Sequence, residues 1–150
     1  MKLWLAQMNP LVGAIESNLA MILAQRDQAI AAGAGAVITP ELSVCGYPPE
    51  DLLFHQGFEA TLKHVLNDWC ASSDSSVAIA LGLPEYSPEG LFNACLWRGV
   101  ASDHPQASKS TAVIHRKQAL PNYQVFDEKR YFNAGQRATV VEHQGVRLGL

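Results

Sequence analysis

Short apolar runs alternate with a segment of helical periodicity in the first part of the chain, whereas apolar runs follow one another directly in the last part. Residues 2–8 and 36–40 are typical of buried strands. Between them, apolar residues recur at helical spacing until Gly33, so we predict a strand–helix–strand unit with Ser17 or Asn18 as the helix N-cap. The apolar positions of that helix are Leu19, Ile22, Leu23 and Ile30.

A second amphipathic helix follows, and beyond it the pattern changes to strands alone. The helix places Phe58, Leu62, Val65, Leu66 and Trp69 on one face. Strands are predicted at residues 77–83, 94–100, 111–116, 139–143 and 146–150. Residues 84–93 are interpreted as a turn region, residues 102–110 as a polar connector, and Gln144-Gly145 as a hairpin turn. Consecutive strands argue against a pure doubly wound sheet and favour sheets with helices on their outer faces.

The composition narrows the classes of partner. With 150 residues and 48% hydrophobic content, the chain has the material for one domain with a buried core. A net charge of −3 gives no broad cationic surface, so we expect no nucleic-acid or anionic-membrane partner. No apolar run approaches the ~20 residues of a membrane span, and the N-terminus is too polar for a signal peptide, which predicts a cytoplasmic protein. The five histidines are scattered, so no metal site is expected.

The three cysteines raise the question of a nucleophile. Cys45 lies four residues after Glu41, but its neighbours form no strained strand-to-helix turn that would present a thiol. Cys70 and Cys95 fall in a predicted helix and strand, where free cysteine is usually a small apolar core residue. We interpret all three as reduced structural thiols.

Glu41 follows a predicted buried strand directly after Pro40. A carboxylate held there on a rigid scaffold is suited to act as a general base. The alternative is a loop or helix-capping carboxylate at the edge of the sheet, and position alone favours that alternative.

Lys117 also follows a predicted strand, and the charged and aromatic sequence "FDEKRYF" comes soon after it. A buried ammonium near a base could stabilise a developing oxyanion. Equally, "HRK" could be a solvated strand end and residues 127–130 a charged turn. Periodicity does not separate the two readings.

Together these segments resemble the carbon–nitrogen hydrolase (nitrilase) superfamily, and within it the N-terminal glutamine amidohydrolase domains of glutamine-dependent NAD synthetases. The resemblance begins at "AQMNPLVGAIESNL", continues through "PELSVCGYPPEDLL" and is strongest at "RKQALPNYQVFDEKRYFNAG". It implies an α/β fold (α+β in some schemes), the four-layer α-β-β-α sandwich of the nitrilase type.

The resemblance also implies roles for four residues. Glu41 would be the general base, and Lys117 would stabilise the oxyanion. Glu128 would be the second glutamate that these enzymes keep beside the triad, and Tyr123 would line the glutamine pocket. The family's nucleophile is a cysteine in a "CED"-like turn after a strand similar to "VRLGL", with which this sequence ends. We therefore expect residues 1–150 to be a glutaminase domain truncated before its nucleophile, inactive by itself, with the sandwich incomplete and the ATP-dependent synthetase domain absent.

The implied activity is hydrolysis of the glutamine side-chain amide, supplying ammonia for the ATP-dependent amidation of nicotinic acid adenine dinucleotide to NAD. The glutaminase part would need no cofactor, whereas ATP and Mg belong to the synthetase domain of the same polypeptide. Superfamily members commonly form homo-oligomers. Two alternatives stay open: a stand-alone amidase of the same superfamily, and a catalytically inactive sandwich module that only binds a partner.

Overall fold

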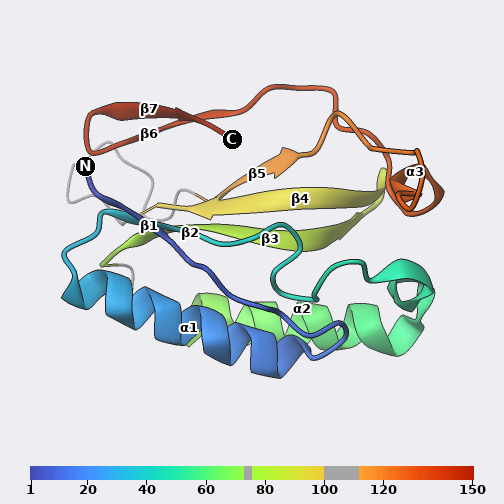
Figure 1. Ribbon diagram of the computed structural model, residues 1–150, viewed down its shortest axis with the longest axis horizontal. Helices are drawn as coiled ribbons and strands as arrows, with labels where there is room; N and C mark the ends of the chain where they lie inside the picture. Colours follow the sequence, from blue (N-terminus) through green and yellow to red (C-terminus); the bar gives the residue numbers. More distant parts are fainter. Residues whose placement is uncertain (73–75, 100–111) are drawn as a thin grey trace.

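The computed structural model describes residues 1–72, 76–99 and 112–150, and these form a sheet with helices on one face and a hairpin on the other (Figure 1). The elements are β1 (Leu3–Leu5), α1 (Ile15–Ala31), β2 (Ala36–Ile38), the 3₁₀ helix η1 (Glu50–Phe54), α2 (Gln56–Ser72), β3 (Ala78–Ser87), β4 (Gly90–Arg98), β5 (Ala112–Arg116), α3 (Glu128–Tyr131), β6 (Val140–His143) and β7 (Val146–Gly149). The mixed α/β fold predicted from the sequence is confirmed.

The main sheet has the strand order β1-β2-β3-β4-β5. β1, β2 and β3 run parallel, as expected for strands joined through helices, whereas β3, β4 and β5 are antiparallel neighbours. The β2–β3 pairing ends at Ile38 opposite Ala80, but β3 and β4 remain paired to Ser87 opposite Gly90. The end of this long hairpin therefore extends beyond β2, past the point where the chain leaves the parallel strands.

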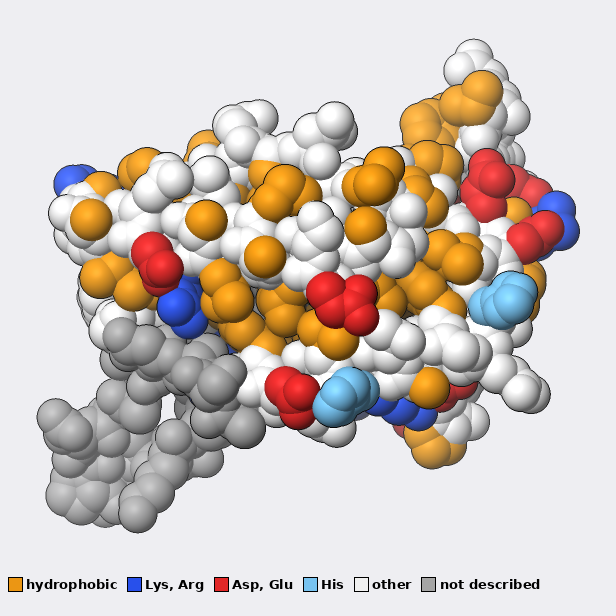
Figure 2. Space-filling view, turned by 90° about the horizontal axis from the view of Figure 1, so that it is seen from below, with side chains coloured by type: hydrophobic (Ala, Val, Ile, Leu, Met, Phe, Trp, Pro, Cys, Tyr) orange, Lys and Arg blue, Asp and Glu red, His pale blue; other side chains and the backbone are white. Residues whose placement is uncertain are grey.

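Helices α1 and α2 cover one face of the sheet (Figure 1). Phe58, Leu62 and Trp69 of α2 are buried, with Val65 and Leu66 partly buried beside them, so the predicted amphipathic face is confirmed. Figure 2 looks onto the outer side of this helical layer, where apolar side chains are interspersed with a few acidic groups and histidines. No helix in the described ranges has both the length and the apolar character to cross a bilayer.

The β6–β7 hairpin lies against the other face of the sheet (Figure 1). Val141 packs in a second apolar cluster with Ala36, Ala80 and Trp97 of the main sheet. His143 is buried there, within 2.9 Å of the Gly35 carbonyl through Nε2 and edge-on to the Trp97 ring. A turn at Gln144 and Gly145, both with positive φ, closes the hairpin as predicted.

Two sequence predictions about helix α1 are wrong. The helix begins at Ile15 with Ala14 as its N-cap, so neither Ser17 nor Asn18 caps it. Asn18 is instead fully buried. Its Oδ1 accepts from the Leu11 N–H at 2.8 Å, and its Nδ2 donates to the carbonyls of Leu11 at 2.7 Å and Val44 at 3.1 Å. Ile30, predicted on the apolar face, is exposed, and the smaller Ala29 is buried in its place.

The predicted turn region at residues 84–93 is also wrong, because both strands continue through it and only Pro88 and Glu89 make the turn. Pro84 is tolerated in β3 because it lies beyond the last β2–β3 pair, where a missing N–H breaks no ladder bond on that side. The remaining predicted strands are present with shifted ends, but β1 is not buried as predicted, because Leu3 and Leu5 are exposed. The predicted connector at residues 102–110 falls outside the described residues.

Candidate active site

Glu41 lies in the tight turn that follows β2, and hydrogen bonds tie this turn to β3. The Thr39 hydroxyl accepts from the Gly82 N–H at 3.1 Å, and the Ser43 hydroxyl donates to Thr39 Oγ1 at 2.8 Å. The Val44 N–H donates to the Gly82 carbonyl at 3.1 Å. Gly82 allows this close approach, because a Cβ there would lie 2.4 Å from the Pro40 carbonyl oxygen. The turn that carries Glu41 is therefore held rigidly against the sheet.

Lys117 directly follows β5, and its backbone is held on both sides. Its N–H donates to the Asn93 carbonyl and its own carbonyl accepts from the Gly135 N–H, both at 2.8 Å. The preceding residue, Arg116, makes a two-pronged ion pair with Glu85 at 2.7 and 2.8 Å and stacks on the Phe92 ring. These contacts fix the end of β5 against the β3–β4 hairpin.

Glu128 is the first residue of the short helix α3, and its side chain is only 6% exposed. Residues 128–131 thus form a helix with a buried carboxylate, and the alternative prediction of a charged turn at residues 127–130 is wrong. One oxygen of Glu128 accepts a hydrogen bond from the Tyr47 hydroxyl at 3.1 Å. Burial and this bond raise the pKa of Tyr47 to about 12, so its hydroxyl stays protonated and donates.

The three residues come together in space although they lie far apart in the sequence. Lys117 Nζ lies 2.6 Å from Glu41 Oε1 and 3.0 Å from Glu128 Oε2. Burial by itself lowers the pKa of Lys117, but hydrogen bonds and charge from Glu41 and Glu128 outweigh it and hold the pKa above its ordinary value. The side chains of Glu41 and Lys117 are 46% and 30% exposed, so the carboxylate and the ammonium both remain accessible from solvent. The arrangement is a permanently charged lysine shared by two carboxylates.

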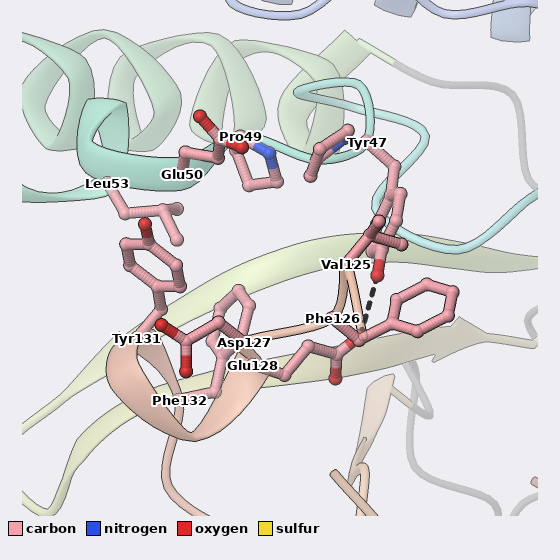
Figure 3. A pocket seen from close by; sticks show the side chains of 11 residues that line it. Tyr47, Pro49, Glu50, Leu53, Val125, Phe126, Asp127, Glu128, Tyr131 and Phe132 are labelled. Atoms are coloured by element: carbon pink, nitrogen blue, oxygen red, sulfur yellow. Dashed lines mark hydrogen bonds between the residues drawn. The ribbon is translucent and has the colours of Figure 1, made fainter. Parts of the chain in front are cut away.

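A cavity of about 300 Å³ opens beside Glu128. Figure 3 shows Tyr47, Pro49, Glu50 and Leu53 on one side of it and Val125, Phe126, Glu128 and Tyr131 on the other. Every charged residue that lines it is acidic, namely Glu50, Asp127 and Glu128. Tyr123 does not line this cavity; its side chain is 63% exposed and its ring meets Phe126, which does line it, edge-on.

None of the three thiols is hydrogen-bonded to Glu41, Lys117 or Glu128 in the described structure. Cys45 is fully buried, its thiol lies 3.5 and 3.4 Å from the Leu42 and Gly46 carbonyl oxygens, and burial raises its pKa to about 12. Burial also raises the pKa of Cys95. Cys70 is exposed at the end of α2, so its predicted place in the core is wrong. A thiol whose pKa is raised by burial is a poor nucleophile.

Two polar residues join the cluster without having been predicted in it. Tyr47 belongs to the "GYPP" sequence that carried the family resemblance, but no role had been assigned to it. Asn93 is 4% exposed and donates from Nδ2 to Glu41 Oε1 at 2.5 Å. Its only sequence signal is one amide within the apolar run "GLFNACLW". Within residues 1–72, 76–99 and 112–150, no three His, Cys, Asp or Glu side chains are grouped so that they could hold a metal ion.

Comparison with known proteins gives one consistent family. The family described as carbon-nitrogen hydrolase matches residues 3–150. The glutamine-dependent NAD(+) synthetase of Synechocystis sp. is 35% identical over 148 residues, which make up 97% of this chain and 26% of that protein. The enzyme of the same name from Acinetobacter baylyi is 33% identical over 150 residues, again 26% of its length. The chain thus spans about a quarter of the length of the curated relatives it matches.

Solved structures give the same grouping. The glutamine-dependent NAD+ synthetase from Acinetobacter baumannii, in complex with ADP, superposes with a TM-score of 0.84 at 31% identity, covering 98% of this chain and 26% of that one. An amidase from Nesterenkonia sp. shares the fold with a TM-score of 0.70 at 22% identity, covering 99% of this chain and 54% of that one.

Proposed function

Given that this chain belongs to the carbon–nitrogen hydrolase family, we propose that it is the glutamine-hydrolysing part of an NAD synthetase. The observation that carries the proposal is the convergence of two carboxylates on one ammonium: Lys117 Nζ lies 2.6 Å from Glu41 Oε1 and 3.0 Å from Glu128 Oε2. The relatives named glutamine-dependent NAD(+) synthetase, matched over nearly the whole chain, support the branch within the family.

In the proposed reaction, Glu41 is the general base. It takes the proton of a cysteine thiol, and the thiolate attacks the carbonyl carbon of the glutamine side-chain amide. The carbon–nitrogen bond then breaks, Glu41 returns the proton to the departing nitrogen, and ammonia leaves. Glu41 next removes a proton from water, whose oxygen attacks the thioester carbon. The carbon–sulfur bond then breaks to release glutamate, and Glu41 returns the proton to the departing thiolate, which restores the thiol. One carboxyl group thereby serves as base and acid in turn.

Lys117 stabilises the negative oxygen of each tetrahedral intermediate. Its raised pKa supports this role, because the ammonium keeps its charge throughout the physiological pH range. Glu128 also accepts a hydrogen bond from the ammonium and is held in turn by Tyr47. A lysine fixed between two carboxylates needs little reorganisation when the oxyanion forms.

The thiol in this scheme is none of Cys45, Cys70 or Cys95. We propose that it is supplied from outside residues 1–150, as the length of the relatives allows. We further propose that a separate synthetase domain of the same polypeptide uses ATP and Mg, whereas the glutaminase part needs no cofactor. We also propose that the enzyme is a cytoplasmic homo-oligomer. The acidic cavity beside Glu128 supports an amide substrate that carries an ammonium group, as glutamine does, and Tyr123 is proposed to border it through Phe126.

The experiment uses the natural polypeptide that carries this chain. Ammonia and glutamate released from L-glutamine are measured for the wild type, for Glu41→Gln and for Glu59→Gln, an exposed glutamate of α2 that serves as the matched control. We expect Glu41→Gln to lose at least about 100-fold in kcat, the contribution of a positioned general base, and Glu59→Gln to keep wild-type activity. Equal activity of the Glu41 variant and the wild type would contradict the proposal.

Assays on the same protein preparation also distinguish two alternative functions. A stand-alone amidase would hydrolyse short aliphatic amides in preference to glutamine and would not pass ammonia to adenylated nicotinic acid adenine dinucleotide. An inactive binding module would release no ammonia from any amide, and a glutamine-like electrophile would form no Glu41-dependent adduct on a cysteine, as judged by mass spectrometry.

A further inference from the structure

Asn93 is hydrogen-bonded to two of the three charged residues of the cluster, Glu41 and Lys117, and no other neutral residue in the described part of the chain bonds both of them. Its side-chain Nδ2 donates to Glu41 Oε1 at 2.5 Å, and its backbone carbonyl accepts from the Lys117 N–H at 2.8 Å. It lies in β4 between Phe92 and Ala94, both buried, and is itself 4% exposed. An amide in such a place costs free energy unless it is hydrogen-bonded, and the Glu41 carboxylate is its partner.

The two donors to Glu41 reach the same oxygen. Lys117 Nζ lies 2.6 Å from Oε1, and Asn93 Nδ2 lies 2.5 Å from Oε1. No group in the described part of the chain donates to Oε2. Two donors on one oxygen fix the rotation of the carboxylate plane, so Oε2 keeps its lone pairs free in one defined direction.

The two donors differ in what they do to a base. The Lys117 ammonium is shared with Glu128 and carries a full charge, which weakens any carboxylate as a proton acceptor. The Asn93 amide is neutral and sits on a strand, so it orients the carboxylate without adding a second charge.

We propose that Asn93 is a positioning residue for the proposed glutamine hydrolysis, which orients Glu41 so that Oε2 is the oxygen that takes up and returns the proton. This inference rests on the proposed function. Asn93 acts through Glu41, and it does not line the cavity beside Glu128. Its loss therefore affects the chemical step and leaves substrate binding unchanged.

The test uses the natural polypeptide with Asn93→Leu, which is similar in size but has no donor. The control is Asn133→Leu, because the Asn133 amide donates to the Glu89 carbonyl at 3.2 Å, at the turn of the same hairpin, and is not hydrogen-bonded to Glu41. We expect Asn93→Leu to lower kcat for glutamine about 10- to 100-fold, with KM unchanged within about twofold. The acid limb of its pH–rate profile should move to higher pH, because a carboxylate that loses a donor binds its proton more readily. Asn133→Leu should keep the wild-type kcat and profile.

A second variant covers the case in which Asn93→Leu does not fold. Asn93→Asp keeps the shape of the side chain but replaces the donor by an anionic acceptor beside Glu41 Oε1, so the acid limb should move further than in Asn93→Leu. A raised KM with unchanged kcat, or an unmoved acid limb in a folded variant, would overturn the inference.

A readout without activity separates this inference from the proposed function. In ¹⁵N-asparagine-labelled protein, the Asn93 side-chain amide proton should move upfield in Glu41→Gln, whereas that of Asn133 should not. An unmoved Asn93 signal overturns the inference. A wild type that shows the Glu41-dependent signal but does not hydrolyse glutamine refutes the proposed function instead.

Discussion

Replacing Glu128 by glutamine removes a buried negative charge while keeping the size of the side chain. Glu128 is 6% exposed, pairs with Lys117 at 3.0 Å and accepts from Tyr47 at 3.1 Å. Removing one partner of a fully buried ion pair costs about 3–5 kcal/mol. Lys117 is 30% exposed and keeps Glu41 as a partner, so solvent screening and the second carboxylate reduce this cost. We expect Glu128→Gln to lower the free energy of unfolding by about 2 kcal/mol.

The assay is urea unfolding at neutral pH, followed by the fluorescence of the buried Trp69 and Trp97. The matched control is Glu59→Gln on α2, which breaks an ion pair of 2.5 Å with Lys63 whose members are 38% and 58% exposed. An exposed helical pair of this kind contributes about 0.5 kcal/mol or less. If both substitutions cost the same, burial does not set the strength of the Glu128 contact and the reasoning fails.

Three further predictions concern other parts of the chain. Because the pKa of Lys117 is raised on folding, its ion pairs stabilise the protein fully below the ordinary lysine pKa of 10.5, and this contribution is lost as the pH rises through the pKa of the folded protein. Lys117→Met should therefore flatten the alkaline fall in the free energy of unfolding, measured by urea titrations at several pH values. Gly82→Ala should destabilise the protein by about 2 kcal/mol or more, because its Cβ would meet backbone atoms of the turn after β2. Gly57→Ala in α2, where a Cβ meets nothing within 4 Å, should instead stabilise it by up to about 1 kcal/mol. Thermal unfolding of both variants measures the two effects. Iodoacetamide at pH 8 should label Cys70, which is exposed, within minutes and leave Cys45, whose pKa is about 12, unlabelled in the folded protein; equal labelling in a mapped digest would contradict the burial argument.

The periodic parts of the sequence predicted the elements well, because burial of one face repeats a signal at every turn or alternate residue. The strand–helix–strand unit, the α2 face and the β6–β7 hairpin were found in this way. The turn predicted at residues 84–93 failed because proline, glycine and serine there usually end strands, and only pairing with β4 shows that β3 continues.

The site was predicted unevenly for a similar reason. Family resemblance assigned roles to Glu41, Lys117 and Glu128, and the structure brings these three residues together. No local sequence pattern identifies Asn93, because its partner, Glu41, lies in a turn 52 residues earlier in the chain. Exposure of Cys70 was missed because a residue at a helix end can face either way, and its neighbours in sequence do not decide which.

The contacts that build the site join residues separated by 52, 76 and 81 positions in the chain. Such contacts close large loops, and their entropy cost delays them until the intervening strands have paired. During synthesis, Glu41 therefore emerges and its turn can fold well before Lys117 and Glu128 exist to engage it. In a newly made chain, the Glu41 carboxylate therefore has no lysine partner until β5 docks, so the charged centre is complete only after β5 and α3 have been synthesised.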